Sequence, residues 1–452
     1  MQRCDTLCIL PLLFSEPHHA GMANIGDTLR VPTVSRVCTD TLVELVYDRE
    51  KRKTALAVSR FGGLWNIEQE VRIETGEILV PYSARNNLIA AECVLLPSKP
   101  EESGFKHELL ADIEAFLHRY VDLSPAFERI AAYYVLLTWV HDAFNELPYL
   151  RARGDYGSGK TRSLIAIGSI CYKPFFASGA STTSPIFHTL DAFGGTLVLD
   201  EADFAYSDAR ADLTKLLNNG TVRGMPVLRT VISKNKEFNP YAFKVFGPKL
   251  VAMRESFQDR ALESRFLTEE TGARSLRPDI PIHLPDCLKA EALALRNRLL
   301  HFRLCEFYNI KTDATALIEG AEPRLNQTAI SLLSLVDDAA ARDEMKRWLL
   351  AQHAGAVAEL EDTVEAGVLA ALLRAISEHP GTTVSIRAIA DCFNADRVVD
   401  DRAHVSNRWV GSFLRKRFRL STQKSNGIYV LAAAQEARIA ALAQRYGLHA
   451  TI

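Results

Sequence analysis

The sequence predicts an α/β fold in which a parallel sheet is built around a phosphate-binding loop, with a smaller unit before it and another after it. Two observations lead to this prediction. From Tyr149 onward, short apolar runs alternate with helical patterns, which is typical of parallel strands joined by crossover helices. Residues 154–161 also match the pattern G-x-x-x-x-G-K-[ST] at every fixed position. The length of 452 residues is enough for roughly three domains, and 48 % apolar with 24 % charged residues is typical of a folded chain.

Charge, hydropathy and cysteine usage narrow the classes of partner. The formal net charge is −2, so no global basic field attracts nucleic acid, and any such contact must come from a local patch. The longest strongly apolar stretch, Ile130 to Val140, is about half of the 18 or more residues that a membrane span requires, so we expect no membrane partner. The eight cysteines form no C-x-x-C pair, which favours reduced thiols in a cytoplasmic protein over a disulfide framework or a zinc site.

The first hundred residues predict a small β-rich unit. Residues 1–21 contain a short apolar run, but Pro11 and the missing cleavage site argue against export, and Met22 is an alternative start. Residues 53–80 alternate apolar and polar side chains as strands do. The polar, proline-rich stretch 97–104 is typical of a linker.

Helical and extended patterns then alternate along the chain. Helices are expected at 107–120 and 125–144, where apolar side chains recur every three to four residues. The clearest buried strands are Leu197–Leu199 and Leu250–Met253, and the pattern from about 284 to 352 is wholly helical. The expected units are 1–100 (β-rich), 101–146 (helical linker), 147–272 (core around the phosphate loop), 273–358 (helical lid), 359–432 (C-terminal module) and 433–452 (C-terminal helix).

The phosphate-loop motif has the structural context that it requires, since it follows a short extended run at 149–151 and opens a helix at Lys160. Its glycines let successive backbone N–H groups turn inward around phosphates, and the helix N-terminus adds positive potential. Lys160 would reach the β and γ oxygens of ATP, and the Thr161 hydroxyl would ligate Mg²⁺. The expected nucleotide contacts are Gly154, Asp155, Tyr156, Gly157, Ser158, Gly159, Lys160, Thr161 and Arg162.

An apolar strand that ends in two carboxylates follows the loop, as a Walker B strand does. Asp200 would hold the Mg²⁺ shell, and Glu201 would orient and polarise the attacking water. The run from Asp200 to Asp203 also spells the signature of DEAD-box RNA helicases. Those enzymes resemble two tandem recombinase-like domains with a Ser-Ala-Thr motif in the second, which this sequence lacks, so we reject that interpretation.

The segment after the acidic pair resembles AAA+ ATPases. A helix at 208–217 is followed by strand-like runs at 227–233 and 237–243, which predict a hairpin. A hairpin in this position is similar to the pre-sensor-1 insertion of minichromosome-maintenance and superfamily-three viral helicases. The resemblance implies that its tip grips one DNA strand in a central channel through Lys234 and Lys236, and a tip that is basic only for solubility is the alternative.

Further arginines are assigned by the same resemblance. Arg254 occupies the sensor-1 position, where the family more usually has Asn, Thr or Ser. The segment around Arg265 is similar to the Ser-Arg-Phe segment of minichromosome-maintenance proteins. This similarity implies an arginine finger for the γ-phosphate of the neighbouring subunit, with Arg260 as the reserve and surface salt bridging as the alternative. Arg324 would be the sensor-2 arginine that contacts bound nucleotide. The competitors for that role are Arg296, Arg298 and Arg303.

The C-terminal module has the pattern of a winged helix. Helices are expected at 364–376, from 384 onward and at 406–418, followed by strands at 419–423 and 427–431. The third helix would enter a major groove, so its polar and basic residues and a lysine on the wing would contact DNA. These residues are Asn407, Arg408, Arg415, Lys416, Arg417 and Lys424. Packing of the module against a protein is the alternative.

The resemblance extends to ATPases of plasmids, prophages and other mobile elements. It implies a cytoplasmic, Mg·ATP-dependent DNA helicase or replication initiator that works as a homo-oligomeric, hexameric ring. A single strand would lie in the channel and duplex DNA at the winged helix. Two other functions remain open. One is an ATP-gated, DNA-binding switch for origin recognition or loading, and the other is a nucleotide-gated signalling or defence ATPase whose N-terminal unit binds an effector.

Overall fold

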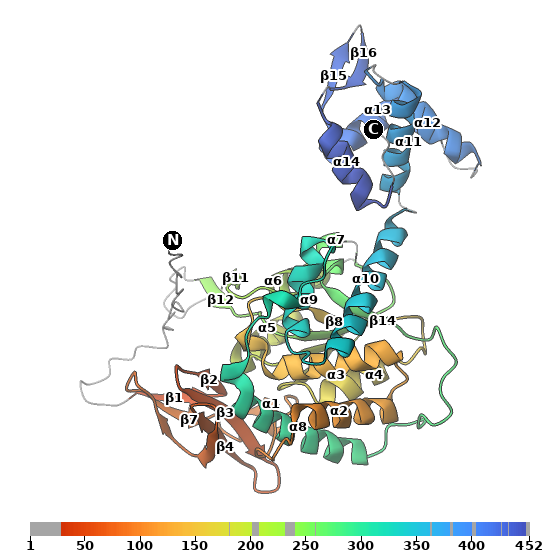
Figure 1. Ribbon diagram of the computed structural model, residues 1–452. Coiled ribbons are helices and arrows are strands. Elements are labelled where there is room, and N and C mark those ends of the chain that lie inside the picture. Colours follow the sequence, from red (N-terminus) through yellow and green to blue (C-terminus); the bar gives the residue numbers. More distant parts are fainter. Residues whose placement is uncertain are drawn as a thin grey trace, which may run out of the picture.

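The computed structural model describes residues 29–448, except positions 180, 201–207, 231–239, 258, 362–363, 380–382, 400–403, 426 and 433. A β-rich part comes first, a central α/β part follows, and a helical part with a small hairpin comes last (Figure 1). The segment 1–21, Glu201, Lys234 and Lys236 lie outside the described residues. In the ranges given, no helix has the length and apolar composition needed to cross a membrane. The cysteines in those ranges are free thiols.

The β-rich part consists of two small sheets. The four-stranded antiparallel sheet has the order β2-β3-β4-β5, and the three-stranded sheet has the order β1-β7-β6. The strands are β1 (Arg30–Thr33), β2 (Ser35–Val37), β3 (Thr41–Asp48), β4 (Lys53–Arg60), β5 (Leu64–Glu68), β6 (Val71–Arg72) and β7 (Ile78–Pro81), followed by the short helix α1 (Asn87–Ala90).

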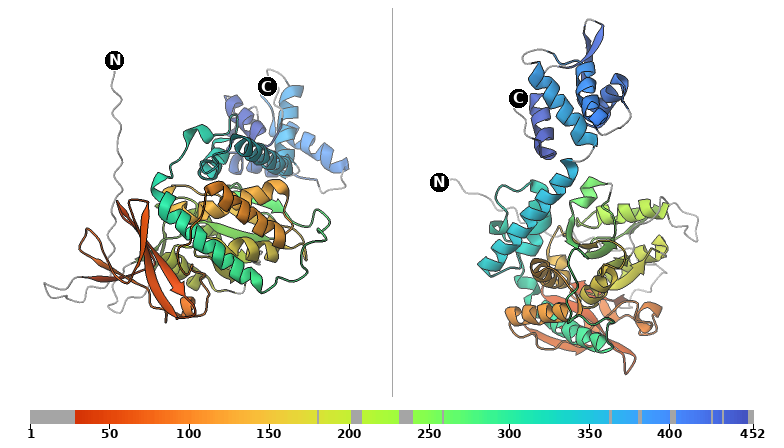
Figure 2. Two further views of the ribbon diagram at one scale, coloured as in Figure 1. Left: turned by 60° about the horizontal axis from the view of Figure 1, so that its bottom comes forward. Right: turned by 90° about the vertical axis from the view of Figure 1, so that its right-hand side faces the viewer.

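Strand β3 lacks the alternating pattern that marked residues 53–80, because both of its faces are buried. Leu42 and Val46 pack in the same hydrophobic core as the helices that follow the β-rich part. Val43 and Leu45 pack in a second core with side chains of the central sheet. A strand covered on both faces is apolar throughout, so alternation does not reveal it. The β-rich part therefore packs directly against the α/β part (Figure 2).

The central sheet is parallel and has the order β14-β8-β13-β10-β9, which confirms the α/β prediction. Its strands are β8 (Tyr149–Arg153), β9 (Phe175–Ser178), β10 (Leu197–Asp200), β13 (Lys249–Met253) and β14 (Phe266–Glu270). The loop 154–161 leaves the carboxyl end of β8, and Asp200 ends β10 at the same edge. Strand β13 lies between these two strands.

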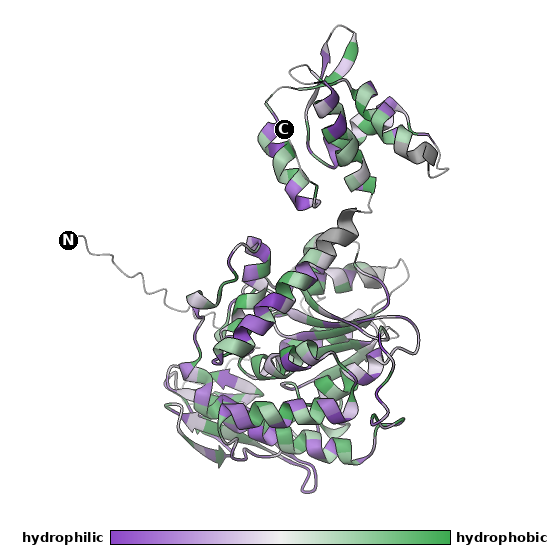
Figure 3. Ribbon diagram, turned by 45° about the vertical axis from the view of Figure 1, so that its right-hand side comes forward, coloured by the Kyte–Doolittle hydropathy of each residue, from purple (hydrophilic) through white to green (hydrophobic). Residues whose placement is uncertain are grey.

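Helices cover both faces of this sheet, whose hydrophobic strands lie between them (Figure 3). One core joins the sheet to α2 (Lys106–Tyr120), α3 (Pro125–Trp139) and α4 (Lys160–Ser169). The other joins it to α5 (Thr183–Phe193) and α6 (Asp208–Asn219). Helix α3 begins where expected, because Ser124 caps it by accepting a hydrogen bond from the Phe127 N–H. A 3₁₀ turn, η1 (His141–Ala143), takes the place of its predicted last turn.

The helices after β14 do not form a core of their own. These helices are α8 (Cys287–Glu306), η2 (Phe307–Asn309), η3 (Ala314–Ala316), α9 (Pro323–Leu333) and α10 (Ala339–Glu361). The short helix α7 (Arg260–Glu263) precedes β14. Leu299 of α8, Leu332 of α9 and Met345 of α10 belong to the same core as α2 and α3. The stretch 97–104, predicted as a linker, runs against α8, where the Asn297 carbonyl accepts the Glu101 N–H at 3.2 Å.

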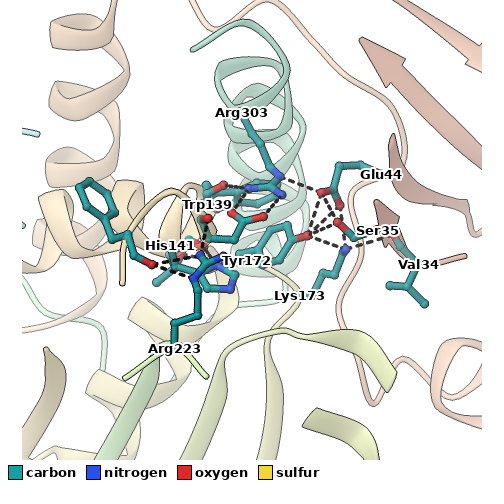
Figure 4. A network of polar contacts seen from close by, with 12 residues as sticks. Val34, Ser35, Glu44, Trp139, His141, Tyr172, Lys173, Arg223 and Arg303 are labelled. Carbon is teal, nitrogen blue, oxygen red and sulfur yellow. Dashed lines mark hydrogen bonds and ion pairs between the residues drawn. The ribbon is translucent and has the colours of Figure 1, made fainter. Parts of the chain in front are cut away.

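A buried polar network ties the β-rich part to the α/β part (Figure 4). Arg303 of α8 pairs with Glu44 of β3 at 2.7 Å and with Asp142 of η1 at 2.6 Å. Lys173 lies 2.7 Å from the same Glu44 carboxylate. Burial alone would raise the pKa of Glu44, but the charges of Lys173 and Arg303 hold it below its ordinary value. Two anions thus face two cations in the interior.

The last part has a separate hydrophobic core. Its elements are α11 (Val364–Glu378), α12 (Ile386–Val399), α13 (Asn407–Lys416), β15 (Thr422–Ser425), β16 (Ile428–Leu431) and α14 (Glu436–Arg445). The hairpin pairs Thr422 with Leu431 and Ser425 with Ile428. Lys424, expected in the turn, lies within strand β15 opposite Tyr429, because the strand begins three residues later than predicted.

Candidate functional site

The phosphate loop owes its shape to three glycines. Gly157 and Gly159 have φ angles of +75° and +92°, which side chains with a Cβ rarely adopt. Gly159 is also the N-cap of α4, so the loop passes directly into the helix N-terminus. A Cβ on Gly154 would lie 2.4 Å from the Thr271 carbonyl oxygen. The N-terminus of α4, whose first backbone N–H groups have no partner within the helix, therefore lies directly after the loop.

Lys160 and Arg254 both lie beside this loop. The Lys160 Nζ donates to the carbonyl oxygens of Gly154 at 2.7 Å and Asp155 at 2.6 Å. Tyr156 is 89 % exposed, and the Arg254 guanidinium lies 5.8 Å from the centroid of its ring. Since Arg254 follows β13 directly, its charge lies at the phosphate-loop edge of the sheet, where a sensor-1 residue was expected.

Thr161 and Asp200 come together at the same edge. The Thr161 hydroxyl donates a hydrogen bond to the Asp200 carboxylate at 2.8 Å. A hydroxyl and a carboxylate oxygen at this separation fit the hard oxygen ligands that Mg²⁺ prefers. The described residues contain no cluster of three or more His, Cys, Asp or Glu side chains suited to a metal. The protein would thus supply two oxygen ligands, and Glu201 lies outside the described residues.

A threonine outside every predicted motif supports the loop. Thr271, which follows β14, forms a hydroxyl–hydroxyl hydrogen bond with Ser158 at 2.8 Å. Its N–H also donates to the Arg153 carbonyl at 2.7 Å. No motif marks Thr271, and only the pairing of β14 with β8 brings it to the loop. Arg162, expected at the nucleotide, instead donates to the carbonyls of Tyr120 and Ile282.

Arg265 lies at the amino ends of the parallel strands, opposite the edge that carries the phosphate loop. Its carbonyl accepts the Tyr149 N–H at 2.9 Å, at the amino end of β8, whereas the loop leaves the carboxyl end. Five residues of β-strand span about 16 Å at 3.3 Å per residue. The Arg265 guanidinium contacts the end of α6, away from the phosphate loop of its own chain.

Arg265 and Arg324 line one cavity of about 230 Å³, together with Glu146, Thr221 and Gln327. Arg324 lies in the first turn of α9 and donates to the Ala261 carbonyl at 3.2 Å. Burial lowers the pKa of Arg265, and the Arg324 charge lowers it further.

That Arg324 contacts bound nucleotide as a sensor-2 arginine stays a prediction. Helix α9 begins beside α7, so Arg324 lies near Arg265 and away from the loop 154–161 of its own chain. Its three competitors are engaged elsewhere. Arg296 donates to the Ser169 carbonyl, Arg298 pairs with Asp112, and Arg303 belongs to the buried network.

The predicted hairpin is confirmed as an antiparallel pair, β11 (Val227–Thr230) and β12 (Pro240–Phe243). Its base is anchored, since the Arg229 guanidinium lies 3.9 Å from the centroid of the Phe187 ring and pairs with Asp212 at 2.6 Å. The two lysines predicted to contact DNA belong to the tip, which lies outside the described residues.

The basic residues of α13 are exposed. Ser406 caps the helix and accepts the Trp409 N–H, while the Trp409 ring stacks on Phe393 of α12 with 6.0 Å between centroids. Arg415 donates to the Thr422 hydroxyl at 2.8 Å and so joins α13 to the hairpin. The exposed residues of this surface, termed the basic face, are Asn407, Arg408, Arg415, Lys416, Arg417 and Lys424.

Comparisons with known proteins give structural neighbours only. No protein-family model matches the chain. No curated protein matches it either. The apo C-terminal region of NrS-1 is similar with a TM-score of 0.37 and 11 % identity over 87 % of this chain and 96 % of that one. The active helicase Cch of SCCmec type IV is similar with a TM-score of 0.32 and 12 % identity over 92 % of this chain and 96 % of that one. The JCV helicase has a TM-score of 0.24 and 16 % identity over 55 % of this chain and 61 % of that one.

Proposed function

We propose that this protein is an Mg·ATP-dependent DNA motor of helicase type, which hydrolyses ATP between the subunits of a homo-oligomeric ring. The observation that carries the proposal is the division of charged groups between the two edges of one sheet. Lys160, Thr161 and Asp200 meet at the carboxyl edge. Arg265 and Arg324 share a cavity near the amino edge.

The carboxyl edge has the chemistry of a triphosphate site. The loop glycines and the N-terminus of α4 present N–H groups to phosphate oxygens, and Lys160 adds a positive charge that can move from loop carbonyls to the β and γ oxygens. Thr161 and Asp200 would hold Mg²⁺, which neutralises charge on the triphosphate when bound. Glu201, the next residue in the sequence, would orient the attacking water.

The phosphate loop lies at the carboxyl edge, whereas Arg265 and Arg324 lie near the amino edge, which favours action on the triphosphate of a second subunit. Arg265 cannot reach the phosphate loop of its own chain across the length of β8. In a head-to-tail ring, one edge of each subunit faces the other edge of the next. Arg265, with Arg324 beside it, would then spread positive charge over the γ-phosphate of the neighbouring subunit.

DNA contact would come from two places. The segment between β11 and β12 contains Lys234 and Lys236, which would follow one strand inside the ring. The basic face would bind duplex DNA as a winged helix does, mostly through phosphates. A cytoplasmic replication helicase or initiator of a mobile element is the concrete form of this proposal.

An ATP-gated switch that binds duplex DNA without unwinding it is the second candidate, and the separate core and basic face of the C-terminal part favour it. A strand-displacement assay on forked DNA, run with the ATPase assay, separates the two. A motor unwinds DNA, whereas a switch hydrolyses ATP slowly and unwinds none. Lys160→Ala should abolish turnover, and Glu201→Gln should retain ATP. Full turnover by Lys160→Ala would contradict both candidates.

A further inference from the structure

The end of α6 holds the guanidinium of Arg265 in place. Arg265 Nη1 donates to the backbone carbonyl of Asn218, to the Asn218 side-chain Oδ1 at 2.8 Å, and to the Leu217 carbonyl at 3.5 Å. Within the described residues, every hydrogen bond of this guanidinium uses Nη1. Because an arginine has five N–H donors, those on Nε and Nη2 remain for a group entering the cavity.

Asn218 is itself held by a second hydrogen bond. Its Nδ2 donates to the Asp259 carboxylate at 2.8 Å, which leaves Oδ1 as the acceptor facing Arg265. Asp259 also starts α7, because its other carboxylate oxygen accepts the Ala261 N–H at 3.0 Å. Helix α7 leads directly to Arg265. A closed circuit of contacts therefore links Asp259, Asn218 and Arg265.

This circuit solves an electrostatic problem. Two guanidinium groups, Arg265 and Arg324, line one small cavity and repel each other, and the nearby carboxylates of Asp259 and Glu146 oppose this repulsion. The end of α6 carries the partial negative charge of a helix C-terminus, and it faces Arg265 Nη1. A long side chain also loses conformational freedom when it is ordered, by about 2 kcal/mol. The contacts of Asn218 offset both effects before any phosphate arrives.

We propose that Asn218 is a positioning residue that holds Arg265 in the orientation needed to reach the triphosphate of the neighbouring subunit. Asn218 itself touches neither nucleotide nor water in the reaction. The inference rests on the proposed function, in which Arg265 acts between subunits. Asn218 belongs to no motif, and it lies at the end of helix α6 rather than in the segment that contains Arg265.

The test compares four variants of the full chain with the wild type: Asn218→Ala, Arg265→Ala, the double variant Asn218→Ala/Arg265→Ala, and Asn219→Ala. Steady-state ATPase gives kcat and KM, and a fluorescent ATP analogue measures nucleotide affinity. Asn218→Ala should lower kcat about tenfold with unchanged nucleotide affinity, since only orientation is lost. The double variant should equal Arg265→Ala, because the two residues act as a unit. Asn219 is the matched control, and its variant should behave as wild type.

A reciprocal exchange tests the direction of the hydrogen bonds. Asn218→Asp places a second carboxylate against Asp259 and should lower kcat. Adding Asp259→Asn restores a donor opposite the new carboxylate, so the pair Asn218→Asp/Asp259→Asn should recover kcat to within about threefold of wild type. If the role of Asn218 were purely structural, Asn218→Ala would lower both the melting temperature and the ATP affinity. We expect neither to fall.

The possible results separate the inference from the function beneath it. If Arg265→Ala has the wild-type kcat, the proposal that Arg265 acts between subunits is wrong, and the role of Asn218 is wrong with it. If Arg265→Ala is inactive while Asn218→Ala has the wild-type kcat, only the role of Asn218 is overturned. Additive losses in the double variant, or loss of ATP affinity in Asn218→Ala, also overturn that role.

Discussion

The Thr161 hydroxyl donates a hydrogen bond to the Asp200 carboxylate at 2.8 Å, although the two residues are 39 positions apart. The contact crosses β13, which lies between the strands that lead to each residue. It brings the loop motif and the acidic strand end into one site.

Asp200→Asn tests this contact. The amide oxygen can still accept from Thr161, so the melting temperature should stay close to that of the wild type, but the negative charge for Mg²⁺ is lost. We expect kcat to fall about 100-fold and the Mg²⁺ requirement to rise in an ATPase titration with Mg²⁺. Asp337→Asn removes an exposed carboxylate and is the control. Wild-type activity of Asp200→Asn would exclude this metal site.

Thr271→Val tests the brace on the phosphate loop. Valine keeps the shape of threonine but loses two hydrogen bonds of its hydroxyl, one of 2.8 Å with Ser158 and one of 2.9 Å that it donates to the Arg153 carbonyl. Only the first holds the loop, so we expect ATP affinity to fall about fivefold, equivalent to that one hydrogen bond of about 1 kcal/mol. Fluorescent-nucleotide titration measures this change, and Thr75→Val, at an exposed hydroxyl, is the control. Unchanged affinity would show that the loop holds its shape without Thr271.

Arg303→Met tests the buried network. Glu44 would lose one cation and Asp142 its guanidinium partner, so we expect a loss of about 3–5 kcal/mol in the free energy of unfolding. Urea denaturation measures this loss, and adding Glu44→Gln should restore part of it. Arg298→Met is a matched control on the same helix, because its ion pair with Asp112 is partly exposed and should contribute less than about 1 kcal/mol. Equal effects of the two variants would contradict the network's role.

Lys249 should make stability depend on pH. It is fully buried and donates to the carbonyls of Val245 and Gly247 at 2.9 Å, and burial lowers its pKa to about 7. Between pH 7 and the ordinary value of 10.5, the unfolded chain binds a proton that the folded chain does not. The free energy of unfolding should therefore rise with pH in this window, relative to Lys249→Met.

Urea denaturation at pH 7, 8, 9 and 10 measures this difference, and Lys289→Met, at an exposed lysine, is the control. Parallel curves for wild type and Lys249→Met would contradict the prediction.

Substitution of the basic face tests duplex binding. Arg408→Ala/Lys416→Ala removes two exposed charges without touching the hydrogen bond of Arg415. Loss of two phosphate contacts should reduce the slope of log affinity against log salt by about 2 and weaken binding to all sequences alike. Fluorescence anisotropy with duplex DNA measures both quantities. Arg387→Ala on α12 is the control, and an unchanged slope would place the duplex elsewhere.

The helices and strands predicted from short stretches of sequence agree with the structure. The loop of residues 154–161 opens a helix at Lys160, β13 contains the strand expected at 250–253, and β11 pairs with β12. These features follow from local chemistry, since glycine φ angles, caps and apolar runs act over a few residues. The sequence analysis missed β3 because both of its faces are buried, and Thr271 because no motif surrounds it.

The sequence by itself determined the groups that we propose bind a triphosphate, namely the glycine loop, Lys160, Thr161 and Asp200. Only the tertiary structure decided where the remaining charges lie. The parallel pairing of β14 with β8 puts Arg265, which directly precedes β14, at the edge opposite the loop, and the start of α9 beside α7 puts Arg324 in the same cavity. The physical reason is that strand order and helix packing depend on contacts between residues far apart in the chain, which no local pattern encodes.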